Sequence, residues 1–389
     1  MDEDSISKTW RLFKMLKINL IGTIFGTSGY DSHCRQLANA LFKLNEDIKL
    51  DVPLPQDYLR LVNDNELKMI NCLNRTPDVT ISVMTPPYWK ICLGDNTKKF
   101  VGFLVWEGDK IPLYWLEYLL DKRVDQIWVP SKHTKDAIKN TLASEHFEGK
   151  IGTEELLLIN KVKIVPHGVD LSIFKPTECK RDSKFTFICN KGWRGTSWDR
   201  GGVQYLLKAF CEEFKKEEEV ELLLKLNASY LHPSQVTQAL DSLNLPQERP
   251  EIKVLINDIP YTKLPELYCM GDVFVCTTRA EAFNLPGIEA MACGLPTIQT
   301  SYGGQVDYMS DKNSIGINYV LECFGNELLY EGILWATPNN DDIRKTLRYA
   351  FNHKEEMKEK GKQALEDSKN WSWNISAQKA MKYLTELFF

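Results

Sequence analysis

Apolar runs of strand length alternate with amphipathic segments of helix length along the first 175 residues. The run at 16–25 predicts a strand, and the segment at 31–45 after it places Cys34, Leu37 and Leu41 on one helical face. Further apolar runs lie at 78–84, 99–107, 124–131 and 161–170. Because strands that alternate with helices usually form a parallel sheet, this part predicts an α/β domain whose sheet is covered on both faces.

A second series of the same kind begins after the polar stretch at 174–184. Its apolar runs predict strands at 185–192, 220–228, 251–258, 272–278 and 296–301, with helices between them. We therefore expect two Rossmann-like domains, 1–175 and 176–371, with binding loops at the carboxyl ends of their strands. The amphipathic end of the chain, 372–389, predicts a last helix that either packs within the second domain or crosses back to the first.

Composition supports this reading and narrows the functional class. The chain has 389 residues, of which 43% are hydrophobic, so it can bury two cores. Its formal net charge of -5 argues against a protein that mainly holds nucleic acid. Ten cysteines without a C-x-x-C pair and six dispersed histidines favour a reducing compartment and argue against structural zinc.

No apolar run is long enough to cross a membrane, and the acidic N-terminus does not resemble a signal peptide, so we expect a cytoplasmic protein. The stretch 7–17 nevertheless sets Lys8 and Arg11 beside Trp10 and Phe13. A weak peripheral contact with an anionic membrane is one interpretation of this stretch. A short amphipathic lead-in to the first strand is the other.

Two glycine-rich loops precede predicted helices. Gly22, Gly26 and Gly29 lie in the first loop without the G-x-G-x-x-G spacing, so they fit a tight turn as well as a phosphate site. Arg194 and Arg200 lie in the second loop, where two guanidinium groups near a helix start suit a diphosphate. Two solvated arginines on a loop are the alternative.

The stretch 277–298 sets two carboxylates, Glu281 and Glu289, around a short turn. Pro286 predicts the first turn of a helix that ends at Gly294. We expect Glu289 in that first turn, where negative charge is favoured. The backbone N–H groups expected between the two glutamates are those of Phe283, Asn284 and Leu285. One carboxylate would then hold a sugar's hydroxyls and the other a ribose, whereas by themselves they are a capping charge and an ordinary loop acid.

Glu281 and Glu289, with "NLP" and "EAMACGLP", resemble the E-x7-E signature of the retaining glycosyltransferases of the GT-B fold, family 4, or glycosyl transferases group 1. Other segments resemble this family in the same order: "GTSGYDSHCRQLANAL", "VDQIWVPSKHTKDAI", "KIVPHGVDLSIFKP", "RGGVQYLLKAF" and "LPELYCMGDVFVCTT". The resemblance covers nearly the whole chain and is firmest from Lys163 to Gly304. It implies two Rossmann-like domains that face each other across a cleft, the first on the acceptor side and the second binding the nucleotide-sugar.

The resemblance also implies an activity. A hexose would move from a UDP-, GDP- or ADP-linked donor to a glycan, a lipid-linked acceptor or another hydroxyl, with retention and without a metal or other cofactor. No clear nucleophile is visible, which favours a same-face displacement over a covalent intermediate. By position, the resemblance implies that Glu281 contacts the donor sugar, Glu289 the ribose, Arg194 and Arg200 the diphosphate, Gly29 the phosphate region, and Asp258, Ile259 and Pro260 the base.

Three departures from the family pattern matter. Asn284 stands where glycine is common, and asparagine tolerates the left-handed conformation. Arg200 stands where lysine is common. Trp106 and Glu107 stand in place of the usual N-domain histidine, so these two and Asp109 are the acceptor-side candidates. A nucleotide-sugar epimerase of GT-B architecture and a non-catalytic sugar-nucleotide-binding partner are the alternative functions.

Overall fold

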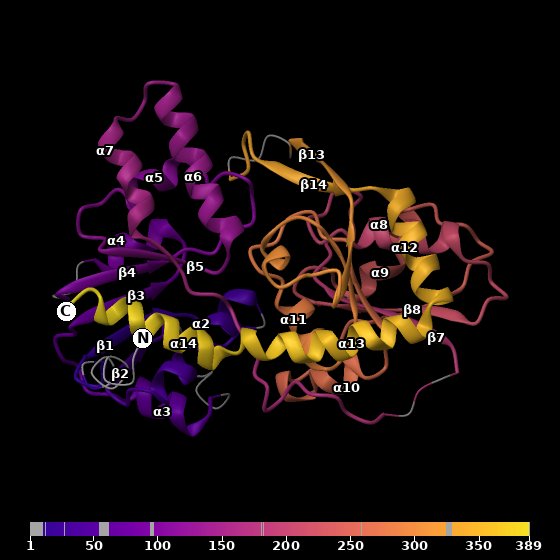
Figure 1. Ribbon diagram of the computed structural model, residues 1–389, viewed down its shortest axis with the longest axis horizontal. Coiled ribbons are helices and arrows are strands. Elements are labelled where there is room, and N and C mark those ends of the chain that lie inside the picture. The colour runs from indigo at the N-terminus through magenta and orange to yellow at the C-terminus, as the bar shows by residue number, and fades with distance from the viewer. Residues whose placement is uncertain are drawn as a thin grey trace. The chain divides into compact units, whose positions relative to one another are not determined.

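The computed structural model describes residues 11, 13–26, 28–53, 62–93, 97–179, 181, 183–257, 259–323 and 329–388. Contacts between residues divide the chain into two compact units. The first comprises Met1–Gly168, Asn326–Ile333 and Ser372–Phe389, and the second comprises Val169–Gly325 and Leu334–Trp371. This division falls a few residues before the expected boundary at 175, and the final helix belongs to the first unit (Figure 1).

The described residues of the first unit form a six-stranded parallel sheet in the order β2-β1-β3-β4-β5-β6. The strands are β1 (Ile18–Gly22), β2 (Ile48–Asp51), β3 (Val79–Val83), β4 (Lys99–Phe103), β5 (Gln126–Val129) and β6 (Val162–Ile164). The helices are α2 (Gly29–Phe42), α3 (Asp64–Ile70), α4 (Trp89–Cys92), α5 (Leu116–Leu119), α6 (Lys132–Phe147), α7 (Thr153–Leu156) and α14 (Trp373–Thr385).

Helix α2 shows how the pattern becomes structure. Ser28 caps it and forms a capping box with Asp31, which satisfies amide groups at the first turn. Cys34, Leu37 and Leu41 are buried, so the predicted apolar face is confirmed. The last helix, α14, packs against α2 (Figure 1).

The described residues of the second unit form another six-stranded parallel sheet, in the order β12-β11-β10-β7-β8-β9. The strands are β7 (Phe185–Lys191), β8 (Val220–Leu226), β9 (Glu251–Leu255), β10 (Val273–Cys276), β11 (Thr297–Thr300) and β12 (Ser314–Ile317). The helices are α8 (Val203–Glu213), α9 (Val236–Ser242), α10 (Leu264–Tyr268), α11 (Leu285–Ala292), α12 (Asn340–Asn352) and α13 (Lys354–Ser368). An antiparallel pair, β13 (Tyr319–Cys323) and β14 (Leu334–Pro338), completes this unit.

Both faces of the second sheet are buried, as a parallel sheet requires. Phe187 and Cys189 of β7 belong to a core with α8 and α12, whereas Ile188 between them belongs to a core with α11. Leu222 and Leu223 of β8 divide between the two cores in the same way. This alternation follows from side chains pointing to opposite faces along a strand. The predicted α/β class with two Rossmann-like domains is confirmed.

Two cysteines are paired. Cys179, on the segment before β7, forms a disulfide with Cys269, which directly follows α10. The scattered spacing of the cysteines gave no signal of the pairing because it joins positions 90 residues apart.

In the part of the chain that the structure describes, no helix is both long and apolar enough to cross a bilayer. Within the stretch 7–17, Lys8 and Trp10 lie outside the described residues. The interpretation of that stretch as a peripheral membrane contact therefore stays a prediction.

Candidate functional site

The carboxyl ends of two neighbouring strands of the second unit bring charged residues together. Strands β7 and β10 are paired in parallel, so the loops that follow them emerge at the same edge of the sheet. Lys191 is the last residue of β7, and Glu281 lies on the loop after β10. The Glu281 carboxylate accepts a short hydrogen bond from Lys191 Nζ and lies 3.8 Å from Arg200 Nη1.

The charges in this cluster are fixed by their partners. Burial alone favours neutral Glu281, but Lys191 and Arg200 outweigh it and hold the pKa of Glu281 below its usual value. Burial also favours a neutral amine at Lys191, yet Cys276 and Glu281 outweigh it, so the pKa of Lys191 is raised. The three side chains therefore form an ion cluster with two positive charges and one negative charge.

The predicted pair of arginines does not act as a pair in this structure. Arg200 lies at Glu281 and donates from Nη1 to Ala280 O at 3.2 Å. Arg194 is exposed, and its backbone N–H donates to Asp199 at 3.0 Å. Lys191, whose side chain is only 8% exposed, supplies the second cation beside Glu281. Sequence reasoning missed Lys191, although a lysine that ends a buried apolar strand is a visible signal.

Close backbone approach holds the Arg200 loop in position. Gly202, at φ 75°, precedes α8, and a Cβ there would lie 1.8 Å from Thr277 O. Thr277 Oγ1 donates to Gly202 O at 2.8 Å, which ties the loop before α8 to the loop after β10. Only glycine meets both the left-handed conformation and the lack of space.

Helix α11 starts beside Glu281, as predicted. Asn284 is its N-cap in the left-handed conformation, at φ 66°, and Gly294 follows its end at φ 84°. The Asn284 amide does not cap the helix but donates to Gln299 at 2.6 Å, while Tyr308 Oη donates to Asn284 O at 2.9 Å. The expected tolerance of asparagine for this conformation is confirmed.

Glu289 differs from its prediction in one respect. Because α11 begins at Leu285, Glu289 lies in the second turn rather than the first, so the first-turn prediction is wrong. Its side chain is buried and accepts a hydrogen bond from Tyr268 Oη at 2.8 Å. Burial raises the pKa of Glu289 to about 7 despite this bond. The second glutamate is therefore a buried, easily protonated acid rather than a fixed negative charge.

The other residues of the second unit that were predicted to contact the donor lie on loops after β9 and β10 and at the start of α11. Ile259 follows β9 and packs at the edge of the core, and Asp258 lies outside the described residues. Phe283 is buried against Tyr308 and Trp371, so its side chain belongs to the core. Leu285 opens α11, where the first helical amides have no partner within the helix. For Phe283 and Leu285, the sequence predicted that the backbone N–H groups, not the side chains, lie between Glu281 and Glu289.

In the first unit, Asp31 at the start of α2 binds backbone N–H groups of the glycine-rich loop. The backbone N–H groups of Gly26 and Ser28 donate to Asp31 at 3.1 and 3.2 Å. Gly29 begins α2, and a Cβ built on it meets nothing within 4 Å. Open space at a helix start is compatible with a phosphate, but the Gly26 amide expected to face one is already bonded.

The acceptor-side candidates of the first unit are engaged by a distant segment of the chain. Trp106 is buried and stacks on Tyr330 with ring centroids 5.3 Å apart. Tyr330 Oη donates to Glu107 at 2.8 Å, and the Asp109 backbone oxygen accepts from Asn140 at 3.0 Å. The Trp106 and Glu107 side chains are thus contacts of Tyr330 in this structure.

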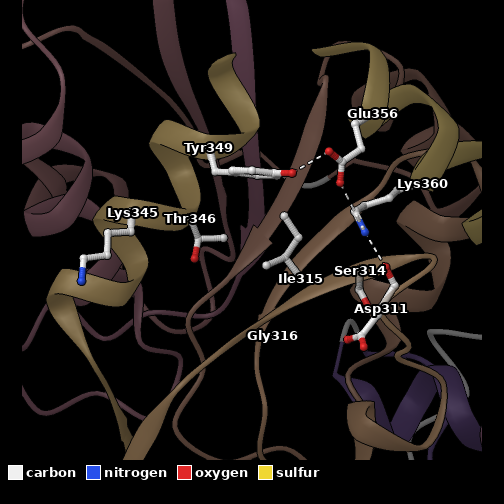
Figure 2. A pocket seen from close by; sticks show the side chains of 9 residues that line it. All are labelled: Asp311, Ser314, Ile315, Gly316, Lys345, Thr346, Tyr349, Glu356 and Lys360. Carbon is white, nitrogen blue, oxygen red and sulfur yellow. Dashed lines mark hydrogen bonds and ion pairs between the residues drawn. The ribbon is translucent and has the colours of Figure 1, made fainter. Parts of the chain in front are cut away.

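A cavity of about 490 Å³ lies elsewhere in the second unit, between β12, α12 and α13 (Figure 2). Within this lining, Tyr349 donates to Glu356 at 2.5 Å, and Lys360 pairs with Glu356 and donates to Asp311 O (Figure 2). None of the predicted site residues lines it. The ion cluster therefore carries the candidate site.

The comparisons with known proteins find similarity to glycosyltransferases over part of the chain. Residues 192–326 match the family model described as Glycosyl transferases group 1. The chain is 29% identical over 146 residues to a mannosylfructose-phosphate synthase of Agrobacterium fabrum, a match that covers 33% of this chain and 31% of that protein. It is 23% identical over 259 residues to a D-inositol 3-phosphate glycosyltransferase of Segniliparus rotundus, covering 56% of each. The chain thus spans less than two thirds of the length of both relatives.

Solved structures share the fold of nearly the whole chain. Anabaena HepE, crystallised with UDP-glucose, matches with a TM-score of 0.66 at 12% identity over 95% of this chain and all of that one. Sucrose-phosphate synthase from Thermosynechococcus elongatus matches with a TM-score of 0.62 at 14% identity, covering 95% of this chain and 98% of the other. The chain thus has the GT-B fold of these solved structures, and its residues 192–326 match the family described as Glycosyl transferases group 1.

Proposed function

We propose that this protein is a retaining glycosyltransferase that moves a hexose from a nucleotide diphosphate sugar to a hydroxyl of a glycan or a lipid-linked acceptor. The observation that carries the proposal is the cluster of Lys191, Arg200 and Glu281 beside the start of α11. Its net charge is positive and suits a diphosphate, and its acid suits the hydroxyls of a sugar. The nucleotide-sugar itself is a substrate, and no cofactor is proposed.

The chemistry follows from charge development. When the glycosidic bond breaks, negative charge grows on the nucleoside diphosphate that leaves. Lys191, Arg200 and the first amides of α11 would stabilise that charge in a buried site, where such interactions are strong. These cations supply the role that a divalent metal has in other transferases, so we propose a metal-independent reaction. Chelation by EDTA is then expected to leave the rate unchanged.

Glu281 and Glu289 would hold the two rings of the donor. Glu281 would accept hydrogen bonds from the hexose, and Glu289 from the ribose. No side chain of the cluster is a clear nucleophile, so the acceptor oxygen would attack on the face from which the diphosphate leaves. Arg194 remains a proposed diphosphate contact, because an exposed loop side chain can turn to a ligand.

The experiment is a donor screen with product analysis. UDP-, GDP- and ADP-hexoses are each incubated with the protein and simple glycan or lipid-linked acceptors, and products are read by mass spectrometry. UDP-glucose is the first donor to test, because HepE of the same fold was crystallised with it. Proton NMR of the anomeric signal reports whether the configuration is retained.

Each outcome of the screen decides between functions. A new glycoside with the donor's anomeric configuration supports the proposal, and an inverted product overturns retention. An epimerised nucleotide-sugar in the absence of acceptor indicates an epimerase instead. Donor binding without any product from the whole panel indicates a non-catalytic binding protein.

A further inference from the structure

Arg279 lies on the loop between β10 and Glu281, and its side chain is among the largest that the structure buries completely. A guanidinium group cannot lose its charge in a protein, so burying it is costly unless it is bonded. The sequence predicted no role for Arg279 in the site. Its contacts explain why it is there.

The Arg279 side chain is bonded to the antiparallel pair β13–β14. Its Nε donates to Ala336 O at 3.1 Å and its Nη2 to Thr337 Oγ1 at 3.0 Å, and Glu322 lies 3.6 Å from Nη2. In return, Ala336 N donates to Arg279 O at 2.9 Å. Both the main chain and the side chain of Arg279 are therefore hydrogen-bonded to β14.

The Arg279 backbone is bonded to the loop that carries Arg200. Its N–H donates to Arg200 O at 2.9 Å, and neighbouring Thr278 Oγ1 donates to the same oxygen at 3.2 Å. Trp198, on the Arg200 loop, and Trp335, on β14, lie with their rings 6.0 and 5.7 Å from the guanidinium carbon. Arg279 thus joins the Arg200 loop, the Glu281 loop and β14.

We propose that Arg279 is a positioning residue that sets Arg200 and Glu281 for the diphosphate of the donor. The inference rests on the proposed function. A buried, bonded charge is often no more stabilising than an apolar side chain of similar size, so stability alone gives little reason to keep it. Its two bonded side-chain donors instead hold the loop after β10 in one position against β14, which a flexible apolar side chain would not do.

The test compares variants that remove the guanidinium at two sites. Arg279→Met keeps the stem and loses the donors. Arg348→Met is the matched control: Arg348 also stacks on aromatic rings and binds Glu213 and Glu218, but it lies on α12, away from the cluster. Titration calorimetry measures the affinity for UDP, GDP and ADP and for their monophosphates, and thermal unfolding measures stability.

The expected result is a change in selectivity rather than in overall binding. For the base that binds most tightly, Arg279→Met should lose about tenfold in affinity for the diphosphate and less than about twofold for the monophosphate, because we expect Arg200 to bind the second phosphate, which a monophosphate lacks. Arg348→Met should lower the unfolding temperature and leave the diphosphate preference unchanged. Arg279→Lys should recover part of the preference, because one ammonium replaces only one of the fork's bonds.

Other outcomes overturn one of the two ideas separately. If the diphosphate preference survives in Arg279→Met, or survives in full in Arg279→Lys should the methionine variant not fold, Arg279 has no positioning role. Equal losses for diphosphate and monophosphate would also overturn it. If the unmodified protein binds none of the three diphosphates, the proposed function itself fails.

Discussion

The two glutamates of the site respond differently to burial because cations lie beside only one of them. Glu281 has Lys191 and Arg200 within ion-pair distance, which lowers its pKa against the effect of burial. Glu289 has Tyr268 as a neutral donor, and burial raises its pKa to about 7. Eight positions apart in sequence, the two acids therefore carry different charges near neutral pH. Local sequence gives no sign of this difference.

Replacing Glu281 by Gln separates binding from transfer. We expect transfer to fall roughly a hundredfold to a thousandfold, a loss typical when one electrostatic group of a reacting site is removed. Affinity for the nucleoside diphosphate should hold or rise, because the carboxylate no longer competes for Lys191 and Arg200. Steady-state kinetics and calorimetry with the same donor measure the two effects.

Glu221 offers the control for that substitution. It is buried and paired with Lys253 at 2.8 Å, but it lies near the amino end of β8, at the opposite edge of the sheet. Glu221→Gln should lower stability without affecting transfer. A parallel loss of diphosphate affinity in Glu281→Gln would contradict the assignment of the cluster.

Glu289 predicts a pH dependence of stability. Its pKa is raised from 4.5 to about 7 on folding, so the folded state keeps a proton that the unfolded state loses between these values. The free energy of unfolding should therefore fall as pH rises from about 4.5 to 7, by about 3 kcal/mol for this group. Glu289→Gln has no such proton, and its stability advantage over the unmodified protein should grow across the interval. Urea unfolding between pH 5 and pH 8 measures this, and parallel curves for the two proteins would exclude it.

At the scale of elements, the site depends on loops that are held by neighbouring loops rather than by their own strands. Asn284 joins the loop after β10 to β11 through Gln299 and to Tyr308. Gly304 N donates to Glu281 O at 2.8 Å, and a Cβ on Gly304 would lie 1.8 Å from Ala282 O. The Glu281 loop is thus packed on both sides, which fixes its carboxylate before any ligand arrives.

Two substitutions at Asn284 isolate the cost of its backbone conformation. Asn284→Gly and Asn284→Ala both delete the amide that binds Gln299, but only alanine carries a Cβ at φ 66°. Asn284→Ala should therefore be less stable than Asn284→Gly by about 1 kcal/mol, the cost of a left-handed residue with a side chain. Thermal unfolding of the two variants measures the difference. Equal stabilities would mean that the loop relaxes away from this conformation.

At the scale of the whole molecule, we expect one buried group in each unit to make stability depend on pH in opposite senses. The second unit contains Glu289, which favours the folded state at low pH. The first unit contains His33, buried between Phe103, His167 and Trp373. Burial, and then His167, hold the pKa of His33 well below 6.5. Burial also lowers the pKa of His167 to about 3.

His33 therefore predicts acid sensitivity of the first unit. Because the unfolded chain takes up a proton near pH 6.5 and the folded unit does not, stability is fully present above this pH and is lost as pH falls toward the folded pKa. The loss should reach about 2 kcal/mol per histidine at pH 5. His33→Leu should flatten this dependence, as measured by urea unfolding at pH 7.5 and 5.

The exposed His353 of the second unit provides a comparison for this test. His353→Leu should keep the pH dependence of the unmodified protein, because it leaves the buried His33 and its neighbours in place. An unchanged slope in His33→Leu would show that other groups cause the acid sensitivity.

The order of elements follows from the sequence because strand and helix periods are local properties. The predicted strands at 16–25, 185–192 and 272–278 all contain observed strands, as do the other predicted runs. Short or polar elements escaped the pattern, among them the four-residue strand β2 and the largely exposed strand β13. The left-handed turn at Asn284 also followed from residue type, because few side chains tolerate it.

Only the tertiary structure decided which charges meet. Glu281 and Asn284 were found by spacing, but Lys191 lies 90 residues before Glu281, and only the pairing of β7 with β10 brings them together. The same holds for Arg279, whose partners on β14 lie 57 and 58 residues away. Local sequence predicted the same role for Arg194 and Arg200. In the structure only Arg200 lies at Glu281, and Arg194 is exposed. The sequence by itself determined the elements and the kinds of chemical group at their ends, because these depend on near neighbours. Burial and long-range contact, which exist only in the folded chain, decided the charge and partner of each group.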